Sequence, residues 1–198
     1  MQKIKLTKTE LRKQKNNLKR FNRYLPILHI KKQQLQKVIE MVRIEQKRVT
    51  ADYDKLIEEM TPWLGLLGED VGLSQLLSIK KIETRVENIA GVDIPVFVAA
   101  QMERKEYDLL LTPLWVDRAV TMIAAMLTLR AEEFILSERL CSLQRELCIT
   151  SQRVNLFEKV KIPEAKEAVR KILIFLGDQQ AAAMGWARIA KNKIKEAG

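Results

Sequence analysis

The sequence predicts a mainly α fold, a long antiparallel two-helix coiled coil of N- and C-terminal helices with a short β-hairpin region between them. Heptad patterns run through residues 1–63 and 114–198, and β-branched residues alternate within the connecting region 64–113. Only 7 Gly and 5 Pro occur among 198 residues, too few turn formers for an all-β sandwich or barrel. We expect these three ranges to form one elongated domain.

The first helix is predicted from apolar residues spaced alternately four and three apart, from Leu28 to Trp63. Either Thr7 or Thr9 is suited to cap its start, and Glu10 follows Thr7 by three residues as in a capping box. Pro26 lies inside the pattern and is expected to kink the helix. The predicted seam residues on this helix are Leu35, Ile39, Val42, Val49 and Leu56.

The second helix is predicted to start after Thr112-Pro113 and to follow the same rhythm. Pro163 interrupts the pattern and should mark a kink or a new first turn, after which the rhythm restarts at Ala165. Val116, Val120, Ile123, Leu127 and Phe134 form the predicted stripe at its start. Its predicted seam residues include Leu140, Leu147 and Val154.

The connecting region has the pattern of two strands around a turn. Alternating residues near Ile82 and Val86, then Val92 and Ile94, flank a turn at residues 88–91. Because an isolated hairpin is marginally stable in water, we expect this one to pack on the helices or on a partner.

The connection between the helices is about 50 residues long and should end near where it began, so we expect the helices to run antiparallel. At the usual rise per residue they would span on the order of 85 Å and 120 Å, which implies a rod. The second helix should extend beyond the first by roughly 15–20 residues. A two-helix rod buries one narrow stripe per helix, so it should need partners.

The charge is concentrated at one end of the chain. The whole chain carries a net charge of +10, and residues 1–50 hold 15 Lys and Arg against 3 Asp and Glu. Such a block suits nucleic acid, an anionic membrane, an acidic protein surface, or simply a solvated helix face. Only Phe21 and Tyr24 are aromatic within it, which gives little support for base stacking.

No arrangement of residues suited to catalysis or to a metal ion is evident, and we expect no cofactor. The sequence has no phosphate-cradling glycine motif and a single histidine, His29. Cys141 and Cys148 are seven residues apart, too few ligands for a zinc site, so we expect them to pack in the seam. Trp63 and Trp115 flank the connecting region and should pack together. No uncharged stretch is long enough to span a membrane.

Several short motifs, in order along the chain, resemble the D subunit of the V-type and A-type ATP synthases/ATPases, the central rotor stalk. The first is Leu6-Thr7-Lys8-Thr9-Glu10-Leu11-Arg12 with Asn16 and Leu18, followed by Tyr24-Leu25-Pro26 with Leu28 and by Lys31-Lys32 with Leu35. The others are Glu87-Asn88-Ile89-Ala90-Gly91-Val92 with Ile94-Pro95, and Arg153-Val154-Asn155 with Glu158 and Ile162-Pro163. The predicted helix–hairpin–helix plan is similar to that family over the whole chain.

The resemblance implies a non-catalytic shaft that couples ATP synthesis or hydrolysis to proton or sodium translocation by rotation. Both helix ends would insert into the cavity of the hexamer of catalytic A and B subunits, with contacts from Arg12, Lys19, Arg20, Arg188 and Lys191. The hairpin would bind the F-type subunit of the central stalk through Val86, Val92 and Ile94. The far end would seat on a d/C-type subunit above the membrane rotor ring. The location implied is cytoplasmic, peripheral to the membrane.

Two other interpretations of the basic block remain open. A nucleic-acid-binding basic coiled coil would use residues 3–48 on phosphates, and its affinity would fall steeply with salt. A membrane-surface protein would use the same block, but its helix lacks a wide apolar face beyond the seam. The rotor stalk implies neither nucleic-acid binding nor direct membrane insertion.

Overall fold

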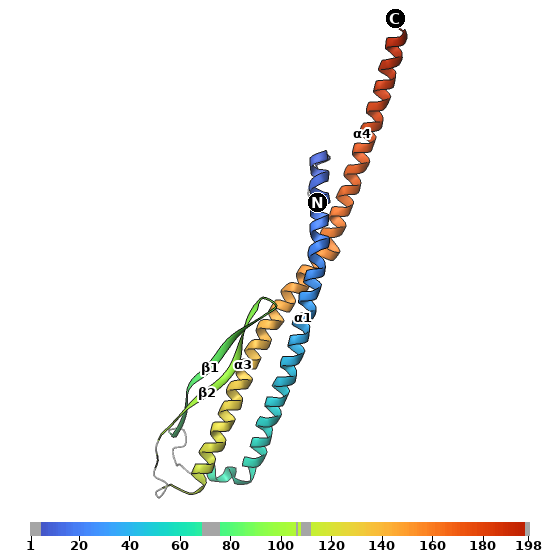
Figure 1. Cartoon of the computed structure of the whole chain (residues 1–198). Helices are drawn as coiled ribbons and strands as arrows, with labels where there is room; N and C mark the ends of the chain where they lie inside the picture. Colours follow the sequence, from blue (N-terminus) through green and yellow to red (C-terminus); the bar gives the residue numbers. More distant parts are fainter. Residues whose placement is uncertain (1–4, 69–75, 106, 108–111, 197–198) are drawn as a thin grey trace. The chain divides into compact units, whose positions relative to one another are not determined.

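The computed structural model describes residues 5–68, 76–105, 107 and 112–196. Its elements are α1 (Lys8–Met60), η1 (Thr61–Gly68), β1 (Leu77–Ile89), β2 (Val92–Arg104), α3 (Trp115–Leu156), η2 (Phe157–Lys161) and α4 (Ile162–Glu196). Figure 1 shows these elements in sequence colours. The chain divides into two compact units. Unit 1 comprises Met1–Lys32 and Ile149–Gly198, and unit 2 comprises Gln33–Cys148.

The predicted fold class is confirmed, with two long antiparallel helical segments and a central two-stranded hairpin. In unit 2, two ion pairs between α1 and α3 show the relative direction of these two helices. Arg48 of α1 lies 3.7 Å from Glu132 of α3, and Glu45 lies 3.7 Å from Arg139. Residue numbers therefore rise along α1 as they fall along α3.

The core of unit 2 is the heptad seam between α1 and α3, closed by the tip of the hairpin. Leu140 and Leu147 are half-buried against this core, and Leu56 is half-buried on α1. Val38 is buried although the heptad stripe does not include it. The buried residues of this cluster are Leu35, Val38, Ile39, Val42, Val49, Ile94, Leu136 and Leu143.

The hairpin pairs β1 with β2 in antiparallel register, from Ile89 against Val92 down to Leu77 against Arg104. Ala90 and Gly91 form the two-residue connection with φ angles of 53° and 76°, the left-handed region that such turns require. Around the turn, the Asn88 side chain accepts a hydrogen bond from the Gly91 backbone N–H at 3.1 Å. The predicted hairpin is thus confirmed, and its strands extend beyond the predicted alternation.

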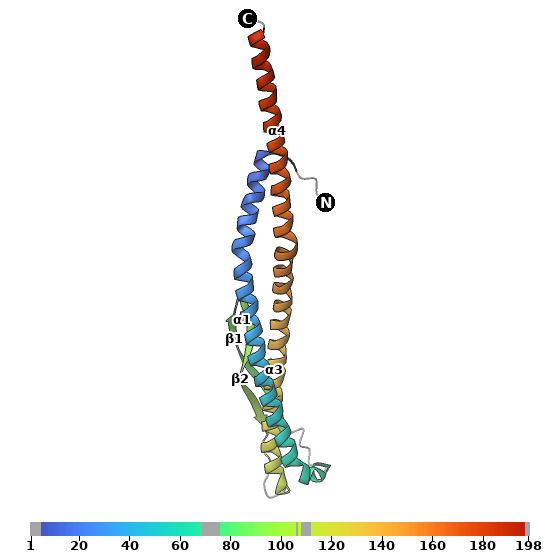
Figure 2. The ribbon, with the colours of Figure 1, turned by 90° about the vertical axis from the view of Figure 1, so that its right-hand side faces the viewer.

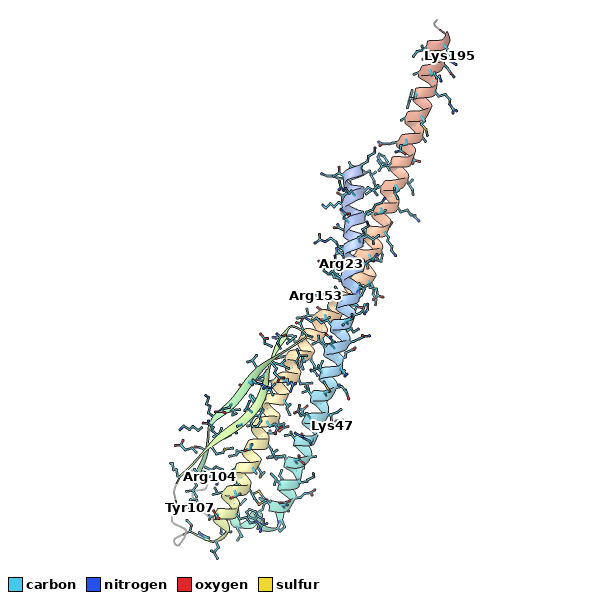
Figure 3. The ribbon with its side chains drawn as sticks, in the orientation of Figure 1. Arg23, Lys47, Arg104, Tyr107, Arg153 and Lys195 are labelled. Carbon is cyan, nitrogen blue, oxygen red and sulfur yellow. The ribbon has the colours of Figure 1, made fainter. Side chains whose placement is uncertain are left out.

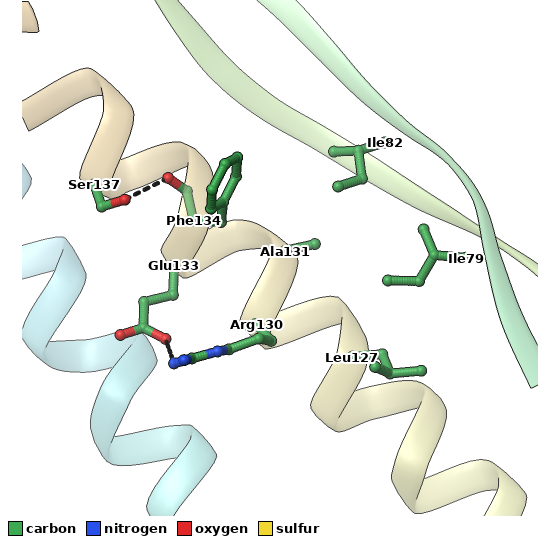
Figure 4. Close-up of a pocket in the computed structure, with 8 residues that line it drawn as sticks. All are labelled: Ile79, Ile82, Leu127, Arg130, Ala131, Glu133, Phe134 and Ser137. Atoms are coloured by element: carbon green, nitrogen blue, oxygen red, sulfur yellow. Dashed lines mark hydrogen bonds and ion pairs between the residues drawn. The ribbon is translucent and has the colours of Figure 1, made fainter. Parts of the chain in front are cut away.

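Two details of the helix pattern differ from the expectation. Cys141 and Cys148 are exposed, because each follows a seam leucine by one residue and so lies about 100° around the helix from the seam. Phe134 is also exposed. It lies two residues before the seam residue Leu136, which turns its ring towards the hairpin side of α3 (Figure 4).

Unit 1 packs the first turns of α1 alongside the end of α3 and the start of α4, as Figure 2 shows. Phe21 of α1 stacks on Phe157 of η2 with ring centroids 5.4 Å apart. The predicted cap is present, since the Glu10 backbone N–H donates to Thr7 Oγ1 at 3.2 Å, and α1 continues through Pro26 without interruption. The buried residues on the opposing helices are Thr150, Val154, Ile162, Ala165, Ala168 and Ile172.

The last turns of α4 extend beyond the start of α1 in both views (Figures 1 and 2). Every residue from Gly177 to Lys195 is exposed. The expected overhang of the second helix is therefore confirmed within unit 1.

Candidate partner-binding surfaces

The described residues contain no group of three or more His, Cys, Asp or Glu side chains placed to hold a metal ion. In the same part of the chain, no helix is both long and apolar enough to cross a membrane.

Unit 1 contains the basic residues predicted from the two ends of the chain, on two separate helical segments. Arg12, Lys19 and Arg20 are exposed on α1, and Arg188 and Lys191 are exposed on α4. We call these five residues the basic end. None of them forms an ion pair with another described residue. Figure 3 shows two more basic residues of unit 1, Arg23 further along α1 and Lys195 near the end of α4.

The end of α4 carries apolar as well as basic side chains. Residues 179–187 contain no charged residue, whereas Arg188, Lys191, Lys193 and Lys195 follow in the final turns. Met184, Ile189 and Ile194 are exposed, and Trp186 is 72% exposed. Large apolar side chains gathered on one exposed segment indicate a protein-binding surface. A phosphate backbone would use the cations but leave the indole ring and the aliphatic side chains in water.

The hairpin presents a second surface, but only one of its three predicted contact residues is available there. Val86 is 69% exposed, whereas Ile94 is fully buried and Val92 packs against the core of unit 2. The register explains this difference. Val86 pairs with Pro95 and the next pair is Glu87 with Ile94, and successive pairs face opposite sides of a sheet.

A groove lies between β1 and the middle of α3, with a volume of about 360 Å³. Ile79 and Ile82 point into it from β1, and Leu127, Ala131 and Phe134 line it from α3 (Figure 4). At its rim Arg130 forms an ion pair with Glu133. The Ser137 hydroxyl turns back and donates to the Phe134 carbonyl at 2.7 Å. The sequence pattern did not reveal this groove, because it assigned Phe134 to the helix seam.

The third surface is an apolar cluster where η1 meets the start of α3. Trp63, Leu66, Leu114, Trp115 and Arg118 surround a cavity of about 390 Å³. The structure thus brings the two tryptophans together, as expected. The Trp63 indole N–H donates to the Glu59 carbonyl at 3.1 Å, which satisfies its polar atom. Leu114 is 96% exposed, so the cluster is open to a partner.

Near this cluster the Tyr107 hydroxyl lies 3.1 Å from an Asp117 carboxylate oxygen. Burial raises the pKa of Tyr107, and the hydrogen bond to Asp117 raises it further. The phenol therefore stays protonated and donates a hydrogen bond to the carboxylate. Figure 3 shows Tyr107 below Arg104, at the open end of the hairpin. This contact ties the chain after β2 to the first turn of α3.

Comparison with known proteins identifies the family. The family model for the D subunit of ATP synthase matches residues 10–192. The V-type ATP synthase D subunit of Borreliella burgdorferi is 45% identical over 196 residues, which cover 98% of this chain and 96% of that protein. The proteins of the same name from Chlamydia trachomatis serovar L2 and Chlamydia muridarum are 34% and 35% identical, each covering 98% of this chain and 97% of the relative. The chain therefore belongs to the ATP synthase D-subunit family, as a non-catalytic subunit of a V-type ATP synthase.

Proposed function

We propose that this chain is the central rotor stalk of its complex. It would couple ATP synthesis or hydrolysis in a hexamer of A and B subunits to proton or sodium translocation, through rotation. Family membership over nearly the full length supports a role in the V-type complex. The observation that carries the stalk role is the exposed end of α4, a helix whose last turns have no packing partner among the described residues.

The basic end and the exposed apolar residues of α4 suit insertion into a cavity between other subunits. A rotating shaft must pass several similar positions without binding tightly to one of them. Exposed ion pairs are worth only about 0–1 kcal/mol each, so distributed charge attracts the shaft without fixing its angle. We therefore propose that Arg12, Lys19, Arg20, Arg188 and Lys191 face the lining of the hexamer.

Two surfaces of unit 2, the outer face of the hairpin and the apolar cluster, suit the other partners. We propose that the F-type subunit binds the outer face of the hairpin, where Val86 is exposed, while Val92 and Ile94 support that face from within. The apolar cluster around Trp63, Leu114 and Trp115 would seat on a d/C-type subunit. In this arrangement the chain is cytoplasmic, peripheral to the membrane, and needs no cofactor.

The test is charge reversal within the basic end. The triple variant Arg12→Glu, Lys19→Glu, Arg20→Glu should fold normally but assemble poorly with A and B subunits, or hydrolyse ATP without pumping ions. Single reversals should have little effect, because each charge contributes weakly. The measurements are co-purification with A and B subunits, ATP hydrolysis, and ion pumping in the reconstituted complex.

A matched control makes the same charge change in unit 2, at the exposed residues Lys37, Arg43 and Lys47. Its assembly with the hexamer should stay within about twofold of the unchanged protein, because lone surface charges contribute little. Equal losses in both triple variants would count against a specific surface at the basic end. If the basic-end variant kept assembly and coupling but lost binding to duplex DNA, the nucleic-acid interpretation would replace the stalk.

A further inference from the structure

The π-helical turn η2 interrupts the second long helix inside unit 1, between α3 and α4. In this turn the backbone N–H of Ile162 donates to the carbonyl of Phe157, five residues earlier, whereas an α-helix uses a four-residue step. A single π turn inside a helix is rare and is frequently found at functional sites.

The spacing of the residues that face α1 changes by one at this turn. Val154 is buried, Phe157 stacks on Phe21, and the next buried residue is Ile162. The step from Phe157 to Ile162 is five residues, where the heptad rhythm would place the next seam residue at Lys161. Lys161 is charged and exposed. The π turn takes up the one extra residue, so that α4 keeps an apolar face towards α1.

Two prolines weaken the backbone on both sides of the same contact. Pro163 has no N–H to donate to the Lys159 carbonyl, and Pro26 has none for the Asn22 carbonyl. Phe21 and Phe157 precede these carbonyls by one and two residues. Along each helix axis the affected residue is thus only about 1.5–3 Å from the phenylalanine backbone. Both helices lose a regular hydrogen bond at one height of the pair.

The side chains at this height bury little apolar surface in comparison with the seam on either side. Leu156 and Val160 are exposed, and Phe21 and Phe157 are only half-buried. By contrast, the seam residues before and after the stacked rings, Val154 and Ile162, are buried. Segments with few buried contacts and irregular hydrogen bonds open at a lower free energy than the rest of a fold.

We propose that residues 157–163 form a compliant joint, imposed by the five-residue step and held in register by the Phe21–Phe157 stack. At this joint the helix pair of unit 1 opens and twists more readily than in the turns on either side. The joint is a property of the chain itself and does not depend on the proposed stalk role.

Hydrogen exchange on the full chain tests the joint directly. After correction for intrinsic rates, amides at 157–164 should exchange at least about tenfold faster than those at 165–172, because local opening is easier there. Equal protection in the two segments would overturn the proposal, and this measurement needs no variant.

Two variants separate the spacing from the proline. Deletion of the exposed Val160 together with Pro163→Ala restores a four-residue step, and should slow exchange at 157–164 at least about tenfold. Pro163→Ala alone keeps the five-residue step and restores at most one hydrogen bond, so it should slow exchange by less than about threefold. The proposal fails if the single substitution slows exchange as much as the combined change, or if the combined variant, shown by circular dichroism to be helical, exchanges like the unchanged chain.

Discussion

Thr150 is a polar residue at a fully buried position of unit 1. Its side chain is 0% exposed, and its hydroxyl has no hydrogen-bond partner among the described residues. A buried hydroxyl without a partner loses its hydration and gains nothing in return. The position therefore favours a residue of the same shape without the hydroxyl.

Thr150→Val should raise the free energy of unfolding by about 1 kcal/mol, since valine matches threonine in shape and needs no hydrogen bond. Thermal and urea denaturation would measure the change. Thr128 provides a matched control, because its hydroxyl donates to the Ala124 carbonyl at 2.8 Å. Thr128→Val should therefore bring no gain, and a gain of equal size there would contradict the explanation.

Glu132 should make the stability depend on pH. Burial is the main cause that raises its pKa above the usual 4.5, and Glu45 and Asp52 add to this while Arg48 opposes it. The folded chain therefore holds this proton more tightly than the unfolded chain does. As the pH falls through the raised pKa and then below 4.5, the contribution of Glu132 should become more favourable to folding.

Glu132→Gln removes this titration. Relative to that variant, the unchanged chain should gain stability between about pH 7 and about pH 4. Urea unfolding across this range measures the difference. Glu40→Gln, at an exposed position of the same unit, controls for the general loss of an acid. A stability difference for Glu132→Gln that does not change with pH would show that the carboxyl is not perturbed.

At the scale of elements, the α1–α3 seam should carry most of the stability of unit 2. Leu35 is fully buried in it, whereas Lys37 is exposed two residues away. Leu35→Ala should lower the free energy of unfolding by about 2–5 kcal/mol, through lost burial and the cavity left behind. Lys37→Ala should change it by less than about 0.5 kcal/mol. Similar losses in urea denaturation would place the seam elsewhere.

Substitutions on the two faces of the hairpin should have different effects, one on partner binding and the other on stability. Val86→Asp places a charge on the exposed face, so it should weaken co-purification of the F-type subunit at least about tenfold and leave the melting temperature unchanged. Ile94→Ala should do the reverse, with a loss of about 2–5 kcal/mol of stability because Ile94 is fully buried. If Val86→Asp bound the F-type subunit as well as the unchanged chain does, the outer face would be removed from the proposed interface.

The helices and the hairpin could be predicted where a single repeating spacing of apolar residues determines the structure. Heptad spacing placed both helices, and Asn88 to Gly91 placed the hairpin turn. The pattern could not decide which face of the hairpin packs on the helices, because residues on both strand faces are apolar. This is why Ile94 and Val86 could not be told apart. The predicted positions of Phe134 and the two cysteines were wrong for a related reason. A shift of one residue turns a side chain by about 100° around a helix, which is enough to move it from the seam to an outer face.

On the scale of the whole molecule, the end of α4 should be dispensable for folding and required for assembly. Every residue from Gly177 to Lys195 is exposed, so a chain that stops after Leu176 loses few internal contacts. Its melting temperature should stay within about 2 °C of the full chain, since surface changes have small effects on stability. Assembly with A and B subunits and coupled ion pumping should both be lost. A large drop in melting temperature would show that this segment packs within the chain.

The position of the two cysteines on one exposed face of α3 makes it possible to measure the orientation of this helix in the assembled complex. Cys141 and Cys148 are the only cysteines in the sequence, and both are exposed on α3. Seven residues correspond to about 10 Å along one face of a helix, a span that a two-armed fluorescent dye can bridge. Such a dye would hold its emission dipole at a fixed angle to α3. Polarised light from single complexes would then report the orientation of this helix, with no residue added or replaced.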